Sequence, residues 1–184
     1  MSALELIDLS KSFGGVQAID SINLTIDEES VYGLIGPNGA GKTTLFNVLT
    51  GFLEPSRGSI QFFEQDITSF QPYEIARLGI ARTYQNIRLF GNMTVRENVA
   101  TAQNYRASFG GLKSLFWSRG KDEADLNNNL EYLLDLMGLW EKRDLVSTDL
   151  SYGEQRRLEI ARACAMKPRL LLLDEPAAGM NEVE

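Results

Sequence analysis

A glycine-rich turn between two apolar segments is the feature that most constrains the fold of this chain. Its sequence is Gly36-Pro37-Asn38-Gly39-Ala40-Gly41-Lys42-Thr43-Thr44. The apolar residues 31–35 before it predict a buried strand, and residues 45–49 after it predict a helix. Strand, glycine-rich turn and helix in this order are the setting of a phosphate-binding loop. A chance glycine turn before a helix is the alternative.

Each part of the turn suits a triphosphate. The glycines let successive backbone N–H groups point inward, and the helix N-terminus adds partial positive charge. Lys42 can reach the β- and γ-phosphates as a compact cation, and the Thr43 hydroxyl can ligate Mg²⁺. Because the Lys-Thr pair and the flanking strand pattern occur together, we predict that the loop binds a nucleoside triphosphate with Mg²⁺.

Composition narrows the class of protein. The 184 residues are 43% hydrophobic and 23% charged, which is typical of one ordinary globular domain. The net charge of −7 argues against a general nucleic-acid-binding role. The single cysteine, Cys164, excludes an internal disulfide, and we expect it to be a small buried apolar residue. No apolar run approaches the roughly 20 residues that span a bilayer, so we expect a soluble or peripheral protein.

Strand patterns indicate two kinds of sheet. Residues 22–27 alternate apolar and polar side chains, and residues 4–6 and 59–62 behave similarly, so we expect a small antiparallel sheet beside the phosphate loop. Residues 31–35 and 170–173 are continuous apolar runs, which are typical of parallel strands covered on both faces.

The middle of the chain is rich in helix signals. Thr94 and Glu97 form a capping box that opens one helix. Apolar spacing from Asp122 predicts a second helix with Gly138 as its C-terminal cap, and a third helix begins at Ser151. We therefore expect an α/β core interrupted by a helical insertion.

Two acidic residues end the apolar run 170–173. A buried strand brings Asp174 and Glu175 to the carboxyl edge of a sheet, where open α/β folds bind ligands. Asp174 is expected to hold the Mg²⁺ shell, through water, and Glu175 to polarise the attacking water as a general base. Two acids that only terminate a strand are the alternative, which is weakened by the phosphate loop upstream.

Two further elements are ambiguous from residues alone. Gln85 follows an expected strand at 80–84, and its amide can ligate Mg²⁺ weakly and contact water. Taken alone it is an ordinary loop glutamine, and only its position between the core and the helical insertion favours a role in the site. Ser151 and Glu154 form a second capping box within Leu-Ser-x-Gly-Glu. That box either only starts a helix or also presents an anion site at its N-terminus.

The phosphate loop, Gln85, Leu-Ser-x-Gly and the Leu-Leu-Leu-Leu-Asp-Glu-Pro segment, in this order, resemble the nucleotide-binding subunit of ATP-binding cassette transporters. The resemblance covers essentially the whole chain. It implies an α/β fold in which a P-loop NTPase (RecA-like) core carries an antiparallel β subdomain and an inserted helical subdomain. It implies one domain over residues 1–184, with the nucleotide-binding core in 1–92 and 161–184 and the helical subdomain in 93–160.

The resemblance also implies a site. Two ATPase subunits would form a head-to-tail dimer, with ATP between the phosphate loop of one and Ser151 and Gly153 of the other. Phe13 would stack on adenine; a core aromatic at a strand end is the alternative. Glu154 stands where the family usually has glutamine and would repel the γ-phosphate, unless it turns toward the helix backbone as the capping box suggests. The expected ATP-binding residues are Phe13, Gly36, Pro37, Asn38, Gly39, Ala40, Gly41, Lys42, Thr43, Thr44, Ser151, Gly153 and Glu154. Thr43, Gln85 and Asp174 are expected at Mg²⁺, and Glu175 and Gln85 in catalysis.

Within the family, residues 83–90 and 158–163 are similar to ATPases of branched-chain amino acid importers. This similarity implies a hydrolysing subunit on the inner face of the cell membrane, bound to permease subunits. A periplasmic or extracellular solute-binding protein would be an indirect partner, and nucleic acid would not be one. Urea importers, the lipopolysaccharide exporter, a soluble ABC-type ATPase and a nucleotide-binding module without hydrolysis stay open as alternatives.

Two segments add expectations of their own. The chain ends at Glu184, before the switch histidine that the family places further on, and it contains no histidine. We therefore expect it to be incomplete at the C-terminus and weakly active by itself. The aromatic segment 109–117 either contacts a permease or, as we favour, forms a satellite cluster on the helical subdomain.

Overall fold

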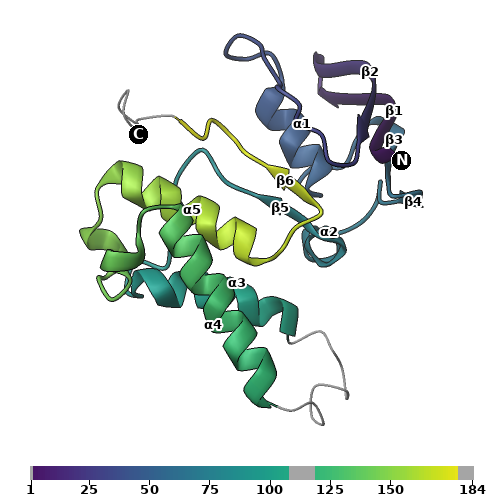
Figure 1. Ribbon diagram of the computed structural model, residues 1–184. Coiled ribbons are helices and arrows are strands. Elements are labelled where there is room, and N and C mark those ends of the chain that lie inside the picture. Colours follow the sequence, from purple (N-terminus) through teal and green to yellow (C-terminus); the bar gives the residue numbers. More distant parts are fainter. Residues whose placement is uncertain (1, 108–118, 178–184) are drawn as a thin grey trace. The chain divides into compact units, whose positions relative to one another are not determined.

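The computed structural model describes residues 2–107 and 119–177 (Figure 1). The chain divides into two compact units, residues 1–80 and residues 81–184. The aromatic segment 109–117 lies outside the described residues.

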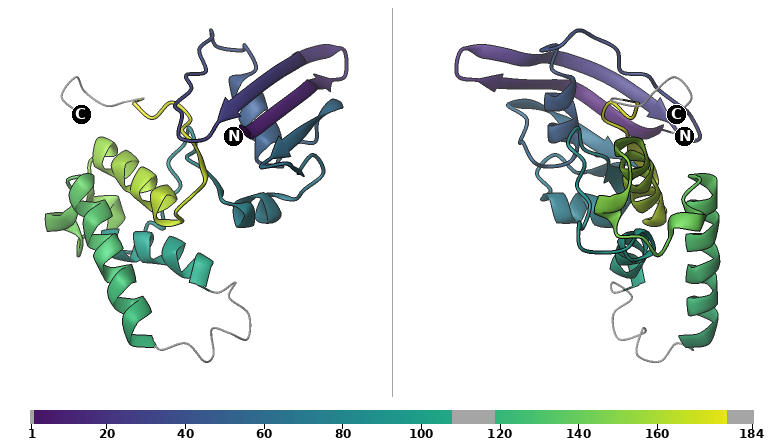
Figure 2. Two further views of the ribbon diagram at one scale, coloured as in Figure 1. Left: turned by 45° about the vertical axis from the view of Figure 1, so that its right-hand side comes forward. Right: turned by 90° about the vertical axis from the view of Figure 1, so that its left-hand side faces the viewer.

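A four-stranded antiparallel sheet dominates the first unit, in the order β2-β1-β3-β4. Its long β1–β2 hairpin is plain in Figure 2. Alternating burial along β1 and β3 places Leu4, Leu6, Ile60 and Phe62 in the core. The expected antiparallel sheet is therefore confirmed. The strands are β1 Ser2–Phe13, β2 Val16–Asp27, β3 Arg57–Phe62 and β4 Gln65–Asp66, and the helices are α1 Lys42–Leu49 and α2 Pro72–Leu78.

The expected strand at 31–35 is wrong. These residues have no regular structure, and Val31 and Ile35 are 99% and 95% exposed. An apolar run becomes a strand only where another strand pairs with its backbone. The strands of the first unit pair among themselves, and residues 31–35 belong to none of the described ladders. The apolar composition of residues 31–35 did not indicate which strand, if any, their backbone would pair with.

The second unit combines a short two-stranded sheet with helices. β5 Ile80–Arg82, which begins at the last residue of the first unit, pairs with β6 Leu170–Leu172. The run is thus confirmed as a strand over 170–172. Its expected burial on both faces is wrong, because within the described part of the chain β6 pairs with β5 alone and Leu173 is exposed. The helical elements are α3 Val95–Ala107, α4 Arg119–Leu136, α5 Tyr152–Ala165 and two short 3₁₀ helices, Trp140–Lys142 and Ser147–Asp149.

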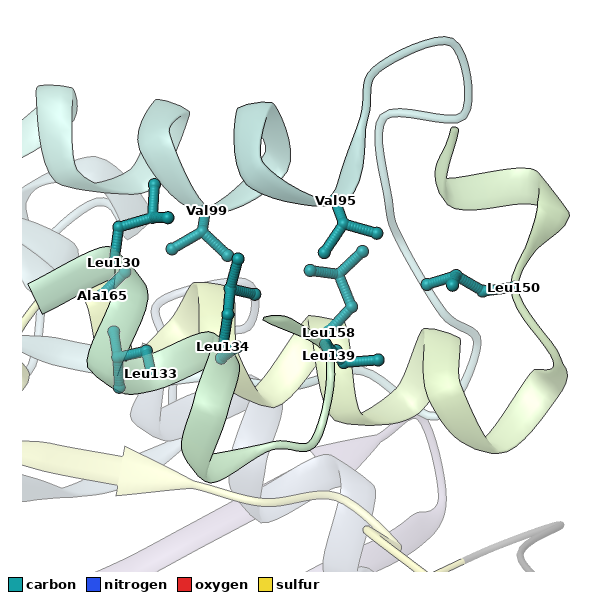
Figure 3. Packing of buried hydrophobic residues seen from close by; sticks show 10 residues of the cluster. Val95, Val99, Leu130, Leu133, Leu134, Leu139, Leu150, Leu158 and Ala165 are labelled. Atoms are coloured by element: carbon teal, nitrogen blue, oxygen red, sulfur yellow. The ribbon is translucent and has the colours of Figure 1, made fainter. Parts of the chain in front are cut away.

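Three helices share one apolar core. Figure 3 shows Val95 and Val99 of α3 directed toward leucines such as Leu134 of α4 and Leu158 of α5. All four side chains are fully buried. The leucine spacing that predicted the second helix therefore marks the face that α4 turns to this core. Cys164 packs against the cluster half-buried, and burial raises the pKa of its thiol.

Local end signals fixed the helix boundaries. Thr94 and Glu97 form the expected capping box at α3, with N–H(97)···Oγ1(94) at 3.2 Å and N–H(94)···Oε2(97) at 2.8 Å. Gly138 has φ 66° and donates its N–H to the carbonyl of Asp135, as expected for a C-terminal cap. The second helix begins at Arg119 rather than Asp122. None of the helices that the structure describes combines the length and apolar character needed to cross a membrane.

Candidate functional site

The glycine-rich loop needs glycine for steric reasons at Gly41. This residue caps α1 with φ 86°, a left-handed conformation, and a Cβ there would lie 2.3 Å from the carbonyl oxygen of Ala18 in β2. Gly39 is also left-handed, with φ 83°. The loop can therefore follow this path only because these positions lack side chains.

Lys42, the first residue of α1, turns back over the loop. Its Nζ donates to the carbonyl oxygens of Gly36 and Pro37 at 2.5 and 2.9 Å. The first turn of α1 contains no acidic side chain, so the positive end of the helix is not neutralised there. The Lys42 cation, the N-terminus of α1 and a loop backbone that leaves no room for a Cβ at Gly41 together suit the binding of a phosphate group. Of the other expected loop residues, Gly36 and Thr44 are half-buried, and the exposed ones are Pro37, Asn38, Gly39, Ala40 and Thr43.

Phe13 lies at the end of β1, opposite Val16 in the hairpin register. Its ring is 46% exposed, and the Lys11 ammonium lies 5.3 Å from the ring centroid. The alternative of a core aromatic is therefore wrong. An exposed aromatic face is what base stacking requires, and that role stays a prediction.

Asp174 follows β6 and is buried in an ion pair. Its Oδ2 accepts from Nη2 of Arg82 at 2.9 Å, and both side chains are more than nine-tenths buried. The Asp174 N–H donates to Oγ1 of Thr83 at 3.2 Å. Because Arg82 balances the charge, Asp174 offers remaining carboxylate lone pairs rather than net charge to a cation. Sequence reasoning missed Arg82; a charged residue inside a strand expected to be buried was the available signal.

Glu175 has an exposed carboxylate and an unusual backbone. Its φ is 47°, in the left-handed region that side chains with a Cβ rarely adopt. Its carbonyl oxygen accepts from Nη2 of Arg156 at 2.9 Å. The hydrogen bond from Arg156 therefore acts on a residue whose backbone has a strained conformation.

The strand expected at 80–84 ends at Arg82, and Gln85 is exposed in the loop that follows it. The Tyr84 carbonyl accepts from Nη1 of Arg156, and the Tyr84 N–H donates to Oε1 of Glu159 at 3.3 Å. The structure therefore attaches the segment before Gln85 and the segment at Asp174 and Glu175 to the same helix, α5.

Arg156 and Glu159 make that attachment, and sequence reasoning missed both. Their side chains are 0% and 2% exposed, and Nη1 of Arg156 lies 2.8 Å from Oε2 of Glu159. The signal was opposite charges three residues apart on a helix. It did not reveal that the pair is buried.

The Leu-Ser-x-Gly segment starts α5 with a complete capping box. Ser151 Oγ accepts from the Glu154 N–H at 3.4 Å, and the Ser151 N–H donates to Glu154 Oε2 at 3.0 Å. The expectation that Glu154 turns toward the helix backbone is confirmed. Gly153 is buried in the first turn. Whether this N-terminus also binds an anion stays a prediction.

A lysine that sequence reasoning missed balances Glu154. Nζ of Lys142 lies 2.5 Å from Glu154 Oε1. This hydrogen bond and those from Ser151 hold the pKa of the Glu154 carboxyl below its usual value. The carboxylate of Glu154, which stands where the family usually has glutamine, is therefore paired with a cation.

The residues expected at Mg²⁺ lie in both compact units: Thr43 in the first, Gln85 and Asp174 in the second. Among the residues that the structure describes, no cluster of three or more His, Cys, Asp or Glu side chains suits a metal. An oxygen set of hydroxyl, amide, one carboxylate and substrate phosphates does not require such a cluster. The Mg²⁺ ligands stay a prediction.

Comparison with known proteins gives one consistent result. Residues 19–178 match the family model of the ABC transporter. The chain is 43% identical to "High-affinity branched-chain amino acid transport ATP-binding protein BraF" of Pseudomonas aeruginosa, over 98% of this chain and 72% of that protein. It is also 43% identical to LivG of Escherichia coli K12, which carries the same description, with the same coverage.

Solved structures agree. An ATP-binding cassette of an ABC transporter in its ADP conformation superposes with a TM-score of 0.80 at 34% identity, covering 98% of this chain and 71% of that one. A nucleotide-free ATP-binding cassette gives 0.78 at 33% identity, covering 97% and 71%. The expected α/β fold of a P-loop NTPase cassette with an antiparallel sheet is confirmed. By its sequence, its fold and its motif order, the chain belongs to the ABC transporter family, whose cassettes bind nucleotide.

Proposed function

We propose that this chain is the ATP-binding and ATP-hydrolysing subunit of an importer of branched-chain amino acids. The phosphate loop supports the binding of ATP, because Gly41 has the backbone conformation and Lys42 the charge that phosphate binding needs. The printed names of the relatives, at 43% identity over nearly the whole chain, support the substrate class.

In this proposal the loop and the N-terminus of α1 bind the phosphates. Lys42 exchanges its hydrogen bonds to the carbonyls of Gly36 and Pro37 for bonds to β- and γ-phosphate oxygens. Phe13 stacks on the base without reading its edge. Mg²⁺, when bound, neutralises phosphate charge, and Thr43, Gln85 and Asp174 are its proposed ligands, Asp174 through water.

Glu175 is the proposed general base. Its carboxylate orients a water molecule and takes a proton from it as the water oxygen bonds to the γ-phosphorus. The bond between that phosphorus and the β,γ-bridging oxygen breaks, and ADP leaves. Gln85 contacts the same water. The exposure of both side chains leaves them accessible to water.

The proposed partners follow from the family. A second ATPase subunit would bring its own Ser151, Gly153 and Glu154 to the nucleotide in a head-to-tail dimer. Permease subunits would hold the pair at the inner face of the membrane, and a solute-binding protein would act indirectly. We propose residues 93–160 as the helical subdomain of one cassette, with residues 1–92 and 161–184 in its core.

The test is transport by the full-length subunit, assembled with its permease partners in proteoliposomes. We expect ATP-dependent uptake of labelled leucine, and its loss in Lys42→Ala but not in Lys167→Ala, which removes the same charge outside the loop. ATP-dependent uptake of urea in place of leucine would contradict the substrate class. Leucine uptake that survives Lys42→Ala would contradict the loop assignment.

A further inference from the structure

We propose that Arg156 is a positioning residue that sets the backbone of the hydrolytic residues Gln85, Asp174 and Glu175. The proposal rests on the proposed function, because it is that function which gives these three residues their roles. Arg156 itself lies inside α5 and is fully buried.

One guanidinium binds two segments that are distant in sequence. Its Nη2 donates to the carbonyl oxygens of Asp174 and Glu175 at 2.6 and 2.9 Å. Its Nη1 donates to the carbonyl oxygen of Tyr84, the residue before Gln85. The planar fork of arginine can reach three carbonyls from one fixed position, whereas the single ammonium of lysine cannot match that geometry.

Glu159 holds the guanidinium in place. Its Oε2 pairs with Nη1 of Arg156 at 2.8 Å, and its Oε1 accepts from the backbone N–H groups of Tyr84 and Arg88 at 3.3 and 3.4 Å. The carboxylate therefore both balances the buried charge and fixes the loop that contains Gln85. These additional hydrogen bonds offset part of the cost of burying the two charges.

The Glu175 backbone is where this positioning matters most. A residue with a Cβ at φ 47° is strained relative to its usual conformations. The hydrogen bond from Arg156 to the Glu175 carbonyl acts directly on that strained unit. Without it, we expect the peptide to relax and the carboxylate to change direction. A displacement of about 1 Å at a catalytic group can cost about 100-fold in rate.

The first experiment separates catalysis from binding in the assembled transporter. Arg156→Met removes the hydrogen bonds, and Arg156→Met/Glu159→Gln removes them without leaving a buried unpaired charge. Arg162→Met is the control for loss of an arginine from α5, because Arg162 is partly buried in the same helix and its guanidinium lies over the Phe90 ring. The readouts are kcat for ATP hydrolysis, ATP affinity and melting temperature.

We expect kcat to fall about 100-fold in both Arg156 variants, with ATP affinity within about twofold of the parent. The double variant should recover melting temperature but not kcat, and Arg156→Lys should recover kcat only in part. A double variant that regains parental kcat would overturn the proposal, since it would assign the effect to the unpaired charge. Equal losses in kcat and affinity, or an equal loss in Arg162→Met, would overturn it as well.

The second experiment does not depend on turnover. Hydrogen exchange of the nucleotide-free protein, followed by mass spectrometry, reports on the backbone at 84–88 and 174–177. We expect faster exchange there in both Arg156 variants than in the parent and in Arg162→Met. Unchanged exchange in these segments would overturn the proposal. A parent that hydrolyses no ATP would instead refute the proposed function, and the exchange measurement would then decide the positioning role by itself.

Discussion

Removing one partner of the ion pair between Arg82 and Asp174 should cost far more free energy of unfolding than the 2.9 Å distance alone suggests. Arg57 and Asp8 form a pair of the same type at 2.7 Å, but their side chains are 72% and 36% exposed, against 4% and 9% for Arg82 and Asp174 at 2.9 Å. Removing one partner of a buried pair leaves an uncompensated charge and costs about 3–5 kcal/mol, whereas an exposed pair contributes about 0–1 kcal/mol. We therefore predict a large loss of stability for Arg82→Met and a small one for Arg57→Met.

Chemical denaturation, followed by tryptophan fluorescence and circular dichroism, measures both losses. Arg82→Met/Asp174→Asn is the decisive companion, because it removes both charges. It should recover more than half of the loss seen in Arg82→Met. If Arg82→Met and Arg57→Met lost the same free energy of unfolding, burial would not control the value of these pairs. If the double variant were as unstable as the single one, the unpaired carboxylate would not be the cause.

Three further predictions concern the two units separately. Gly41→Ala should abolish ATP binding, measured by calorimetry, because its Cβ would meet the Ala18 carbonyl at 2.3 Å; unchanged affinity would contradict the loop geometry. Phe13→Ala should weaken ATP and GTP binding by similar factors, and a loss confined to one base would mean that another residue reads the base edge. Glu154→Gln keeps the capping box but loses the charge, so it should destabilise the protein by about 0.5 kcal/mol after allowance for solvent screening. Because folding lowers the pKa of Glu154, this stabilisation is present at neutral pH and is lost as pH falls through the folded-state value, so thermal melts of parent and variant should converge in acid.

Local signals made most helices and the antiparallel sheet predictable. Capping boxes at Thr94 and Ser151 depend on residues three positions apart, so sequence spacing was enough to find them. The alternation in residues 22–27 likewise predicted a strand that is half-buried on one face. By contrast, residues 31–35 were predicted as a strand from apolarity alone, and pairing depends on a partner that this pattern does not identify.

The motifs of the candidate site were predictable from the sequence, but the side chains that hold those motifs in place were not. Arg156 contacts residues 72 and 18 positions away, and Lys142 reaches Glu154 across 12 positions. Such contacts arise from tertiary packing, so neither spacing nor composition assigned these side chains a role. The resemblance to a family supplied motif roles, but it carried no information on a pair such as Arg156 and Glu159.

The central claim, that this cassette binds ATP and hydrolyses it with Glu175, is tested most directly by Glu175→Gln in the full-length subunit assembled with its partners. The amide keeps the shape of the side chain and removes the charge that accepts the proton. Two quantities are needed: steady-state phosphate release and equilibrium binding of ATP. We predict that phosphate release falls by about 100-fold or more while ATP affinity is kept and an ATP-bound dimer accumulates. Phosphate release at the parental rate would contradict the account.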